Sequence, residues 1–179
     1  IGGIPDSLMN LTDMLTLKLS SNKFSGSIPV NISNLINLDT LDFSDNNFSG
    51  SLPENLFELG KMTYLDINSN NFTGSIPNNI GSLGSVQYIY MNHNELSGSI
   101  PTSIGDLSQL KNFKLHVNLV SGSIPDEICN IYINNDNARV SLDNNLLCPP
   151  YPDCITIDQL GYKYGGFPWS DTFINQDCE

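Results

Sequence analysis

Basic side chains are scarce in this 179-residue sequence, which has seven Lys and Arg against 19 Asp and Glu and a formal net charge of −12. A protein that binds nucleic acid neutralises phosphates with many Lys and Arg side chains. The composition therefore argues against nucleic acid as a partner. The negative charge favours solubility and repulsion from anionic surfaces.

Long apolar runs are also missing from the sequence. No stretch of about 18 apolar residues could cross a bilayer, and the first residues lack the charged-then-apolar pattern of a signal peptide. We therefore expect a soluble, mature chain without membrane insertion.

Histidine, the residue type most used in catalysis, occurs only twice, as His93 and His116. Neither has a fixed partner nearby in the sequence, and no serine lies in a nucleophile motif. We expect no enzymatic activity, no catalytic residue and no cofactor.

Cysteine is present four times, always late in the sequence, at Cys129, Cys148, Cys154 and Cys178. An even number clustered in a terminal segment is typical of disulfide staples. A zinc site is less favoured, because three prolines replace the short flexible gap of a zinc knuckle between Cys148 and Cys154.

Four N-glycosylation sequons point to the same oxidising compartment. They begin at Asn10, Asn31, Asn47 and Asn71. Asparagine is abundant here, so one or two sequons would arise by chance. Together with the cysteines they predict a secreted or cell-surface glycoprotein.

An internal repeat carries most of the information in the sequence. Six prolines are spaced by 24 residues without drift, at Pro5, Pro29, Pro53, Pro77, Pro101 and Pro125. Five of them follow Gly-Ser-Ile or Gly-Ser-Leu, and each turn before these segments carries an asparagine, at Asn22, Asn46, Asn70, Asn94 and Asn118. A fixed period of this length indicates a solenoid built of one stacked unit.

Each unit begins with alternating apolar residues, Leu15, Leu17 and Leu19 in the first copy. Later copies pair Leu41 with Phe43, Leu65 with Ile67, Ile89 with Met91, and Phe113 with Leu115. Alternation with period two predicts a short strand with one buried face. A strand this short must stack on its neighbours, so we expect a parallel sheet with strands about 4.8 Å apart.

Two apolar ribs should run the length of the core. One consists of Phe24, Phe48, Phe72, Leu96, Val120 and Leu147, and the other of Leu8, Ile32, Leu56, Ile80, Ile104 and Ile128. We interpret the asparagine column as structural, because its amides can satisfy backbone groups where the chain leaves the strand.

The string L-x-x-L-x-L-x-x-N-x-L/F-S/T-G-S-I-P closely resembles the plant-type leucine-rich repeat of receptor-kinase ectodomains and polygalacturonase-inhibiting proteins. Five consecutive copies match in register, and the resemblance covers residues 1 to about 147. It implies an α/β solenoid: a right-handed arc with a parallel concave β-sheet and an irregular or 3-10 convex side. Ligands are then expected on the concave or lateral face.

The final segment, Cys148-Pro149-Pro150-Tyr151-Pro152-Asp153-Cys154, is similar to the C-terminal cap of secreted leucine-rich-repeat proteins. We therefore divide the chain into a solenoid of about six repeats over residues 1–147 and a disulfide-bonded cap over residues 148–179. Four cysteines permit three pairings. Counting positions around the coil favours Cys129–Cys154 and Cys148–Cys178.

Both ends pose a packing problem, because a solenoid needs caps over its last apolar layers. At the C-terminal end we expect an aromatic lid, formed by Tyr162, Tyr164, Phe167, Trp169 and Phe173. At the N-terminal end no cysteine-bearing cap precedes the first repeat. Either the chain is a fragment of a longer protein, or another molecule covers the edge at Ile4, Leu8 and Leu11.

Side chains that point out of the strands vary between repeats, whereas the framework does not. The richest part of this face is the candidate ligand-binding site, with Tyr64, Asp66, Tyr88, Tyr90, His93, Lys114, His116 and Arg139. Aromatic residues flanked by polar groups suit peptide or sugar recognition. An ordinary solvated sheet surface is an equal alternative.

Two clusters on this face could suggest other chemistry. His93, His116 and Asp143 lie on neighbouring repeats, but only their spacing supports a metal or catalytic site, so we expect no metal. Asp42, Asp45 and Asp66 could bind calcium loosely and are more simply surface acids.

Three functions remain open. The first is an extracellular module that recognises a protein, peptide or polysaccharide. The second is a structural subunit that self-associates through its uncapped N-terminal edge into a fibre. The third is an inhibitor of a secreted polysaccharide-degrading enzyme. Ice binding is disfavoured, because the strand columns change identity at each step.

Overall fold

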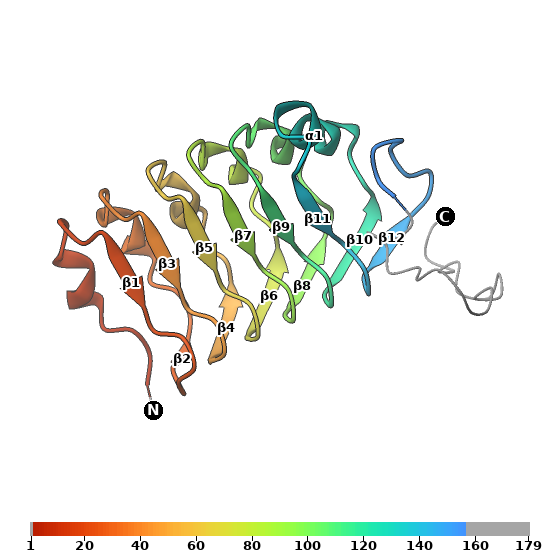
Figure 1. The fold of residues 1–179 in the computed structure, drawn as a ribbon. Helices are drawn as coiled ribbons and strands as arrows, with labels where there is room; N and C mark the ends of the chain where they lie inside the picture. Colours follow the sequence, from red (N-terminus) through yellow and green to blue (C-terminus); the bar gives the residue numbers. More distant parts are fainter. Residues whose placement is uncertain (1, 157–179) are drawn as a thin grey trace.

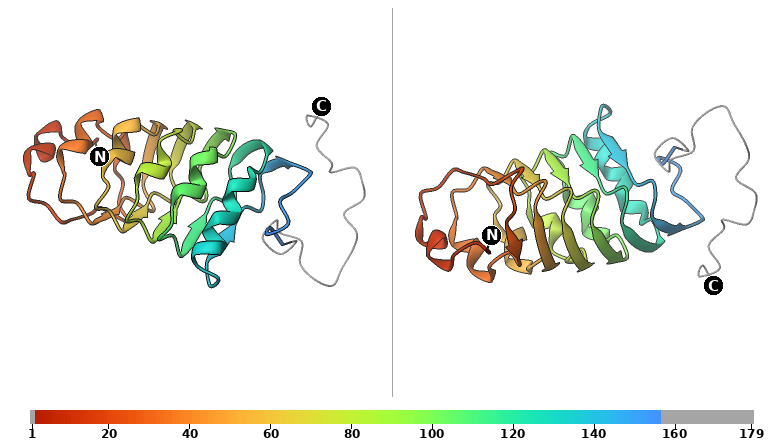
Figure 2. Two further views of the ribbon diagram at one scale, coloured as in Figure 1. Left: turned by 90° about the horizontal axis from the view of Figure 1, so that it is seen from above. Right: turned by 90° about the horizontal axis from the view of Figure 1, so that it is seen from below.

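The computed structural model describes residues 2–156. They form a solenoid whose coils follow one another along a single long axis (Figures 1 and 2). Each coil contains a strand of a first sheet, a strand of a second sheet and a short helical turn. No helix in the described part of the chain is long and apolar enough to cross a membrane.

The first sheet contains six parallel strands in the order of the sequence. They are β1 (Thr16–Lys18), β3 (Thr40–Asp42), β5 (Tyr64–Asp66), β7 (Tyr88–Tyr90), β9 (Asn112–Lys114) and β11 (Arg139–Ser141). Residues 24 apart pair directly, as Leu41 does with Leu65 and Leu65 with Ile89. The strict period of the sequence therefore becomes the register of this sheet.

The second sheet follows each turn and is also parallel. Its strands are β2 (Ser25–Gly26), β4 (Asn47–Ser51), β6 (Asn71–Ser75), β8 (Glu95–Gly98), β10 (Leu119–Ser123) and β12 (Leu146–Cys148). The first five of these strands run into the repeated Gly-Ser-Ile-Pro or Gly-Ser-Leu-Pro segments.

Short helical turns form the opposite side of the coil. They are the 3-10 turns η1 (Asp6–Asn10), η2 (Val30–Asn34), η3 (Glu54–Glu58), η4 (Ile80–Ser82), η5 (Thr102–Asp106) and η6 (Asp126–Cys129), and the helix α1 (Asn130–Asn134). Five of the six 3-10 turns begin directly after one of the spaced prolines, whose fixed φ and missing N–H suit this position. The solenoid with a parallel sheet and 3-10 turns on the other side is thus confirmed.

The core is continuous and includes the predicted ribs, whose end members Leu8, Phe24 and Leu147 are only partly buried. Phe48 and Phe72 are fully buried, and the Phe48 ring stacks on those of Phe24 and Phe72 with centroids 6.0 and 6.2 Å apart. Leu15 was wrongly grouped with the buried positions: it is 62% exposed. Its counterparts in the next four copies are polar, beginning with Asp39, and this position lies before the strand rather than in it.

The asparagine column forms a hydrogen-bonded ladder beneath the turns, as predicted. Asn94 is a typical rung: its Nδ2 donates to the carbonyl oxygens of Ile67 and Met91, and its Oδ1 accepts the Phe72 N–H at 3.0 Å. Asn46, Asn70 and Asn118 repeat these contacts in their own coils. The ladder thus provides hydrogen-bond partners for buried backbone N–H and C=O groups at the turns between the two sheets.

The residue before each of these asparagines adopts a left-handed backbone conformation. Its φ lies between 53° and 57° in all six coils, at Ser21, Asp45, Ser69, His93, Val117 and Asn144. Small polar residues tolerate this conformation, whereas a β-branched valine does so only under strain. His93, which was expected to point out of a strand, therefore lies in the turn that follows β7.

The sixth coil is longer than the others, because about three extra residues separate Asn118 from Asn145. The structure places the insertion on the helical side, where α1 follows η6 directly. The Cys129–Cys154 disulfide fastens this helical side to the segment that follows β12 and has a Cα–Cα distance of 5.6 Å. This predicted pairing is confirmed. The Cys148–Cys178 pairing and the aromatic lid involve residues that lie outside the described part.

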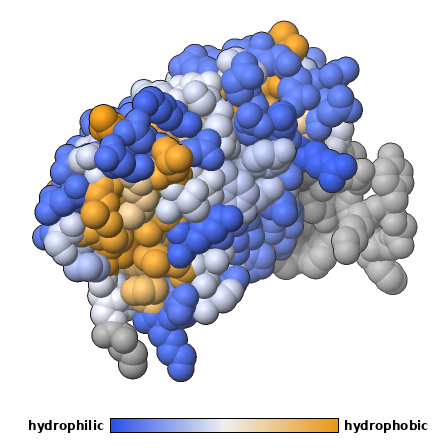
Figure 3. Space-filling model, turned by 60° about the vertical axis from the view of Figure 1, so that its left-hand side comes forward, coloured by the Kyte–Doolittle hydropathy of each residue, from blue (hydrophilic) through white to orange (hydrophobic). Residues whose placement is uncertain are grey.

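The N-terminal coil exposes apolar surface (Figure 3). Ile4 is buried, Leu8 is half-buried and Leu11 is 52% exposed. Of the three residues expected at an uncovered N-terminal edge, only Leu11 is therefore largely exposed.

Candidate ligand-binding face

The outward side chains of the first sheet form a regular grid, which we call the strand face. Each of its four columns takes one residue from each of six coils. The first holds Thr16, Thr40, Tyr64, Tyr88, Asn112 and Arg139, and the second holds Lys18, Asp42, Asp66, Tyr90, Lys114 and Ser141. The third holds Ser20, Ser44, Asn68, Asn92, His116 and Asp143, and the fourth consists of the left-handed residues from Ser21 to Asn144.

Three tyrosine side chains meet at the centre of this grid. Tyr64 lies on β5, and Tyr88 and Tyr90 lie on β7, the next strand. The ring centroid of Tyr64 is 6.1 Å from that of Tyr88 and 5.7 Å from that of Tyr90, and the Tyr88 and Tyr90 centroids are 6.4 Å apart. The three rings thus form one contiguous aromatic surface, which we call the tyrosine platform.

Asp66 lies beneath this platform and is only 6% exposed. Its carboxylate accepts hydrogen bonds from the Tyr64 hydroxyl at 3.0 Å, from the Asn68 backbone N–H at 3.0 Å and from the Asn68 side-chain amide. The interpretation of Asp66 as a surface acid was therefore wrong. Two tyrosine rings and the amide of Asn68 cover it, and it supports the platform from below.

Burial has electrostatic consequences for this group of residues. It raises the pKa of the Asp66 carboxyl, although the hydrogen bonds from Asn68 and Tyr64 oppose the shift. Burial, followed by the adjacent Asp66 charge, also raises the pKa values of the Tyr64 and Tyr90 hydroxyls. Both phenols are therefore firmly protonated at neutral pH, so they act as neutral hydrogen-bonding groups.

Lys114 lies on the other side of Tyr90. Its Nζ is 4.8 Å from the centroid of the Tyr90 ring, within the range of a cation–π contact. Arg139 is exposed on β11 and pairs in register with Asn112. Lys114 and Arg139 therefore place positive charge on the two strands that follow the platform, and Asp42 places negative charge on the strand before it.

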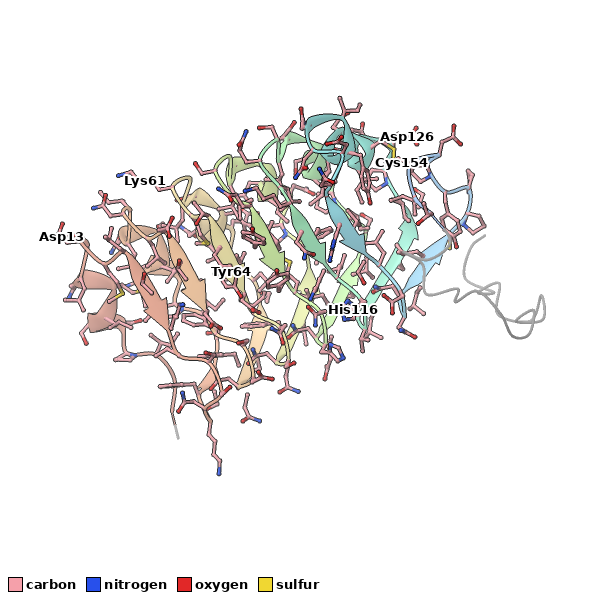
Figure 4. All side chains as sticks on the ribbon, in the orientation of Figure 1. Asp13, Lys61, Tyr64, His116, Asp126 and Cys154 are labelled. Atoms are coloured by element: carbon pink, nitrogen blue, oxygen red, sulfur yellow. A yellow bond between two sulfur atoms is a disulfide. The ribbon has the colours of Figure 1, made fainter. Side chains whose placement is uncertain are left out.

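The two histidines also meet, at the ends of consecutive strands. The rings of His93 and His116 are edge-to-face with centroids 5.2 Å apart, and Asn92 Nδ2 lies 2.9 Å from His93 Nδ1. Figure 4 shows that His116 and Tyr64 lie on the same side of the first sheet. The sequence correctly predicted that these side chains share one face.

Ser141, which the sequence analysis did not single out, connects His116 with Asp143. Its hydroxyl donates to Asp143 Oδ1 at 2.8 Å and lies 3.0 Å from His116 Nδ1. With its proton directed to Asp143, the Ser141 oxygen accepts the His116 Nδ1–H. A serine nucleophile would instead direct its proton to the histidine. The arrangement orients the imidazole and does not activate the serine.

Desolvation lowers the pKa of the His116 imidazole, and the nearby His93 and Lys114 add to this effect while Asp143 opposes it. His116 is therefore neutral at pH 7. Among the described residues, no cluster of three or more His, Cys, Asp or Glu has the geometry to hold a metal ion.

The sequons lie away from the strand face. Asn47 and Asn71 occupy one column of the second sheet, on β4 and β6, and both are exposed. Asn10 is exposed in η1, and Asn31 is half-buried in η2. Glycans at these positions would leave the tyrosine platform open.

Comparison with known families decides which family this fold represents. A model of the leucine-rich repeat region matches residues 5–134. The chain belongs to the leucine-rich-repeat family. No match to this leucine-rich-repeat protein was found among curated proteins.

Among solved structures, this leucine-rich-repeat protein is similar to the ectodomains of plant receptor kinases. The Arabidopsis receptor kinase HAESA, in complex with the peptide hormone IDA and the co-receptor SERK1, is 38% identical with a TM-score of 0.78, over 84% of this chain and 25% of that one. The receptor kinase GASSHO1/SCHENGEN3 from Arabidopsis thaliana, in complex with CASPARIAN STRIP INTEGRITY FACTOR 2, is 31% identical with a TM-score of 0.77, over 82% of this chain and 17% of that one.

A plant ice-binding protein is also similar, at 25% identity and a TM-score of 0.58, over 86% of this chain and 64% of that one. This leucine-rich-repeat protein thus spans about a sixth to a quarter of the length of the two receptor ectodomains. It shares the binding fold of such ectodomains, which is usually non-catalytic.

Proposed function

We propose that this protein is an extracellular recognition module whose ligand site is the strand face, centred on the tyrosine platform. One observation carries the proposal. The framework of the solenoid repeats with a constant period in the first five coils, whereas the strand face concentrates three contacting tyrosines, a buried carboxylate and an oriented histidine pair in its central coils. The similar receptor ectodomains that form complexes with a peptide hormone or another protein factor support this function.

The proposal includes an extracellular location for the protein and a disulfide-bonded cap at the C-terminal end of the solenoid. The Cys129–Cys154 disulfide requires an oxidising compartment, and the exposed sequons at Asn10, Asn47 and Asn71 suit N-glycosylation during secretion. We accordingly assign residues 1–147 to the solenoid and residues 148–179 to a disulfide-bonded cap.

The test is a ligand screen with a paired variant. The folded protein and its Tyr88→Ala/Tyr90→Ala variant are each immobilised and probed with the same displayed peptide library and the same oligosaccharide array. Both substitutions lie on β7, and neither removes the Tyr64–Asp66 hydrogen bond. We expect ligands that bind the protein and lose binding in the variant. Ligands that bind both proteins equally would place the site elsewhere.

Ice binding is a second candidate function. The feature that favours it lies on the second sheet and not on the first. One exposed position, at the end of its strands or one residue beyond, is identical in five consecutive coils: Ser27, Ser51, Ser75, Ser99 and Ser123. This regularity is the feature that the strand face lacks, and a plant ice-binding protein has a similar fold. A recrystallisation-inhibition assay tests it: activity lost on replacing Ser51, Ser75 and Ser99 by lysine supports ice binding, and no activity in the unmodified protein rejects it.

A further inference from the structure

We propose that the tyrosine platform binds a neutral oligosaccharide built of pyranose rings, laid across the strands of consecutive coils. This inference rests on the proposed function and specifies the chemical class of the ligand. It follows from the packing of the rings, the groups that surround them and the charge of the molecule.

The ring packing favours stacking over the capture of a cation. A cage for an ammonium group needs aromatic faces arranged around a gap, but the three tyrosine rings contact one another with centroids 5.7 to 6.4 Å apart. One face of Tyr90 is already occupied by Lys114 Nζ, which would repel a second cation. The platform therefore offers aromatic surface to a flat, uncharged ligand, such as the C–H face of a pyranose ring.

The direction of the ligand follows from the columns. Tyr64 and Tyr88 occupy the same column in adjacent coils, so their rings follow one another along the solenoid axis, with their planes tilted by 45°, and each ring offers its own face to one sugar. A chain of sugar rings that stacks on both must run across the strands.

Polar groups around the platform suit the hydroxyls of a sugar. Asn68 follows the first tyrosine-bearing strand, and Asn112 and Thr40 flank the tyrosines in their own column. Primary amides present a donor and an acceptor side by side, which matches two neighbouring hydroxyls. Asn68 is fixed by its bonds to Asp66 and by the Ser69 hydroxyl, which donates to its Oδ1 at 2.8 Å. Groups held in place before binding reduce the entropy cost of binding.

The other ligand classes fit this face less well. A peptide held by side-chain anchors needs apolar contacts, yet Val117 is the sole aliphatic side chain among the strand-face positions from Thr16 to Asn144. A polyuronate or another polyanion would approach a chain with a net charge of −12. A neutral glycan meets neither obstacle.

Isothermal titration calorimetry with three neutral hexasaccharides, cellohexaose, mannohexaose and hexa-N-acetylchitohexaose, tests this inference. A galacturonic acid hexamer serves as the anionic comparison. We expect at least one neutral hexasaccharide to bind, and the anionic hexamer to bind more weakly. Tyr88→Ala should weaken binding about tenfold, whereas Tyr88→Phe, which keeps the ring, should stay within about threefold.

The outcomes separate the ligand class from the site. If no neutral hexasaccharide binds at millimolar concentration, the sugar assignment is overturned. The proposed function still stands in that case if peptides from the displayed library bind the protein and not the Tyr88→Ala/Tyr90→Ala variant. If a hexasaccharide binds the protein and both alanine variants equally, the platform is not the site and both proposals fail. Equal loss in Tyr88→Phe and Tyr88→Ala would reject stacking.

Discussion

Among single residues, Asp66 shows how local chemistry departs from a surface pattern. Its position in the strand alternation is that of an outward residue, and the sequence therefore placed it on the solvent side. The structure buries it because the tyrosines of its own and the next strand are large enough to cover a short carboxylate. The alternation of apolar and polar residues along a strand predicts which way a side chain points. It does not predict whether neighbouring side chains bury it.

Replacing Asp66 by alanine should destabilise the protein. The Tyr64 hydroxyl and the Asn68 N–H would lose their acceptor, and each buried group without a partner costs about 1–3 kcal/mol. Urea unfolding followed by circular dichroism measures the loss. The matched control is Asp13→Ala, which removes an exposed carboxylate and should change the free energy of unfolding by less than about 0.5 kcal/mol. Equal effects of the two substitutions would show that Asp66 does not support the platform.

His116 should make the stability of the protein sensitive to acid. Its folded-state pKa lies below the unfolded value of about 6.5, so the unfolded state takes up more protons as the pH falls through that value. Stability is therefore fully present above the unfolded pKa and declines on acidification toward the folded pKa.

The measurement compares the protein with His116→Asn at pH 7.5 and pH 5.5. Asparagine does not titrate, and its amide can still donate to the Ser141 hydroxyl. We expect the unfolding midpoint in urea to fall on acidification by more in the protein than in the variant. An identical fall in both would assign the acid sensitivity to other groups.

At the scale of the elements, the period of the sequence was the most informative feature. Spacing of 24 residues predicted the stacking of strands, the two ribs and the asparagine ladder, because each identical unit meets its copy in the next coil. The left-handed residue before each asparagine could not be recognised from hydrophobic alternation. The residue types at this position carried the signal for a left-handed conformation, since five of the six residues are small, polar or His. Val117 is the exception that makes this signal hard to recognise.

The ladder yields a prediction about position within the solenoid. Asn94→Ala would leave the Phe72 N–H and the carbonyls of Ile67 and Met91 without that amide, at a cost of about 2–4 kcal/mol. Asn22→Ala in the first coil should cost about 1 kcal/mol or less, because Asn22 is exposed and water can replace it. Urea unfolding of both variants tests this difference. Similar losses would mean that the rungs do not act by satisfying buried groups.

At the scale of the whole molecule, the fold class and one disulfide followed from the sequence, whereas the geometry of the binding face did not. Positions around a coil can be counted, so Cys129 and Cys154 could be paired. The contacts among Tyr64, Tyr88 and Tyr90, and the role of Ser141 between His116 and Asp143, depend on side-chain directions that a repeat pattern does not specify.

The disulfide should stabilise the C-terminal end of the solenoid. It links residues 25 apart, and closing a loop of that length in the unfolded chain contributes about 3.5 kcal/mol in the chain-entropy model. Cys129→Ser/Cys154→Ser should therefore unfold at lower urea concentration. Hydrogen exchange should rise first in α1 and β12 and remain low in β5 and β7, because a solenoid couples mainly neighbouring coils. Uniformly faster exchange would contradict this local role.

The measurement that tests the central claim most directly is a crystal structure of the protein with the tightest ligand from the paired screen. Recognition by the strand face predicts a ligand that contacts Tyr64, Tyr88 and Tyr90 and extends toward Lys114 across consecutive coils. A ligand bound to the helical side or to the second sheet, with the tyrosine platform free, would contradict the account.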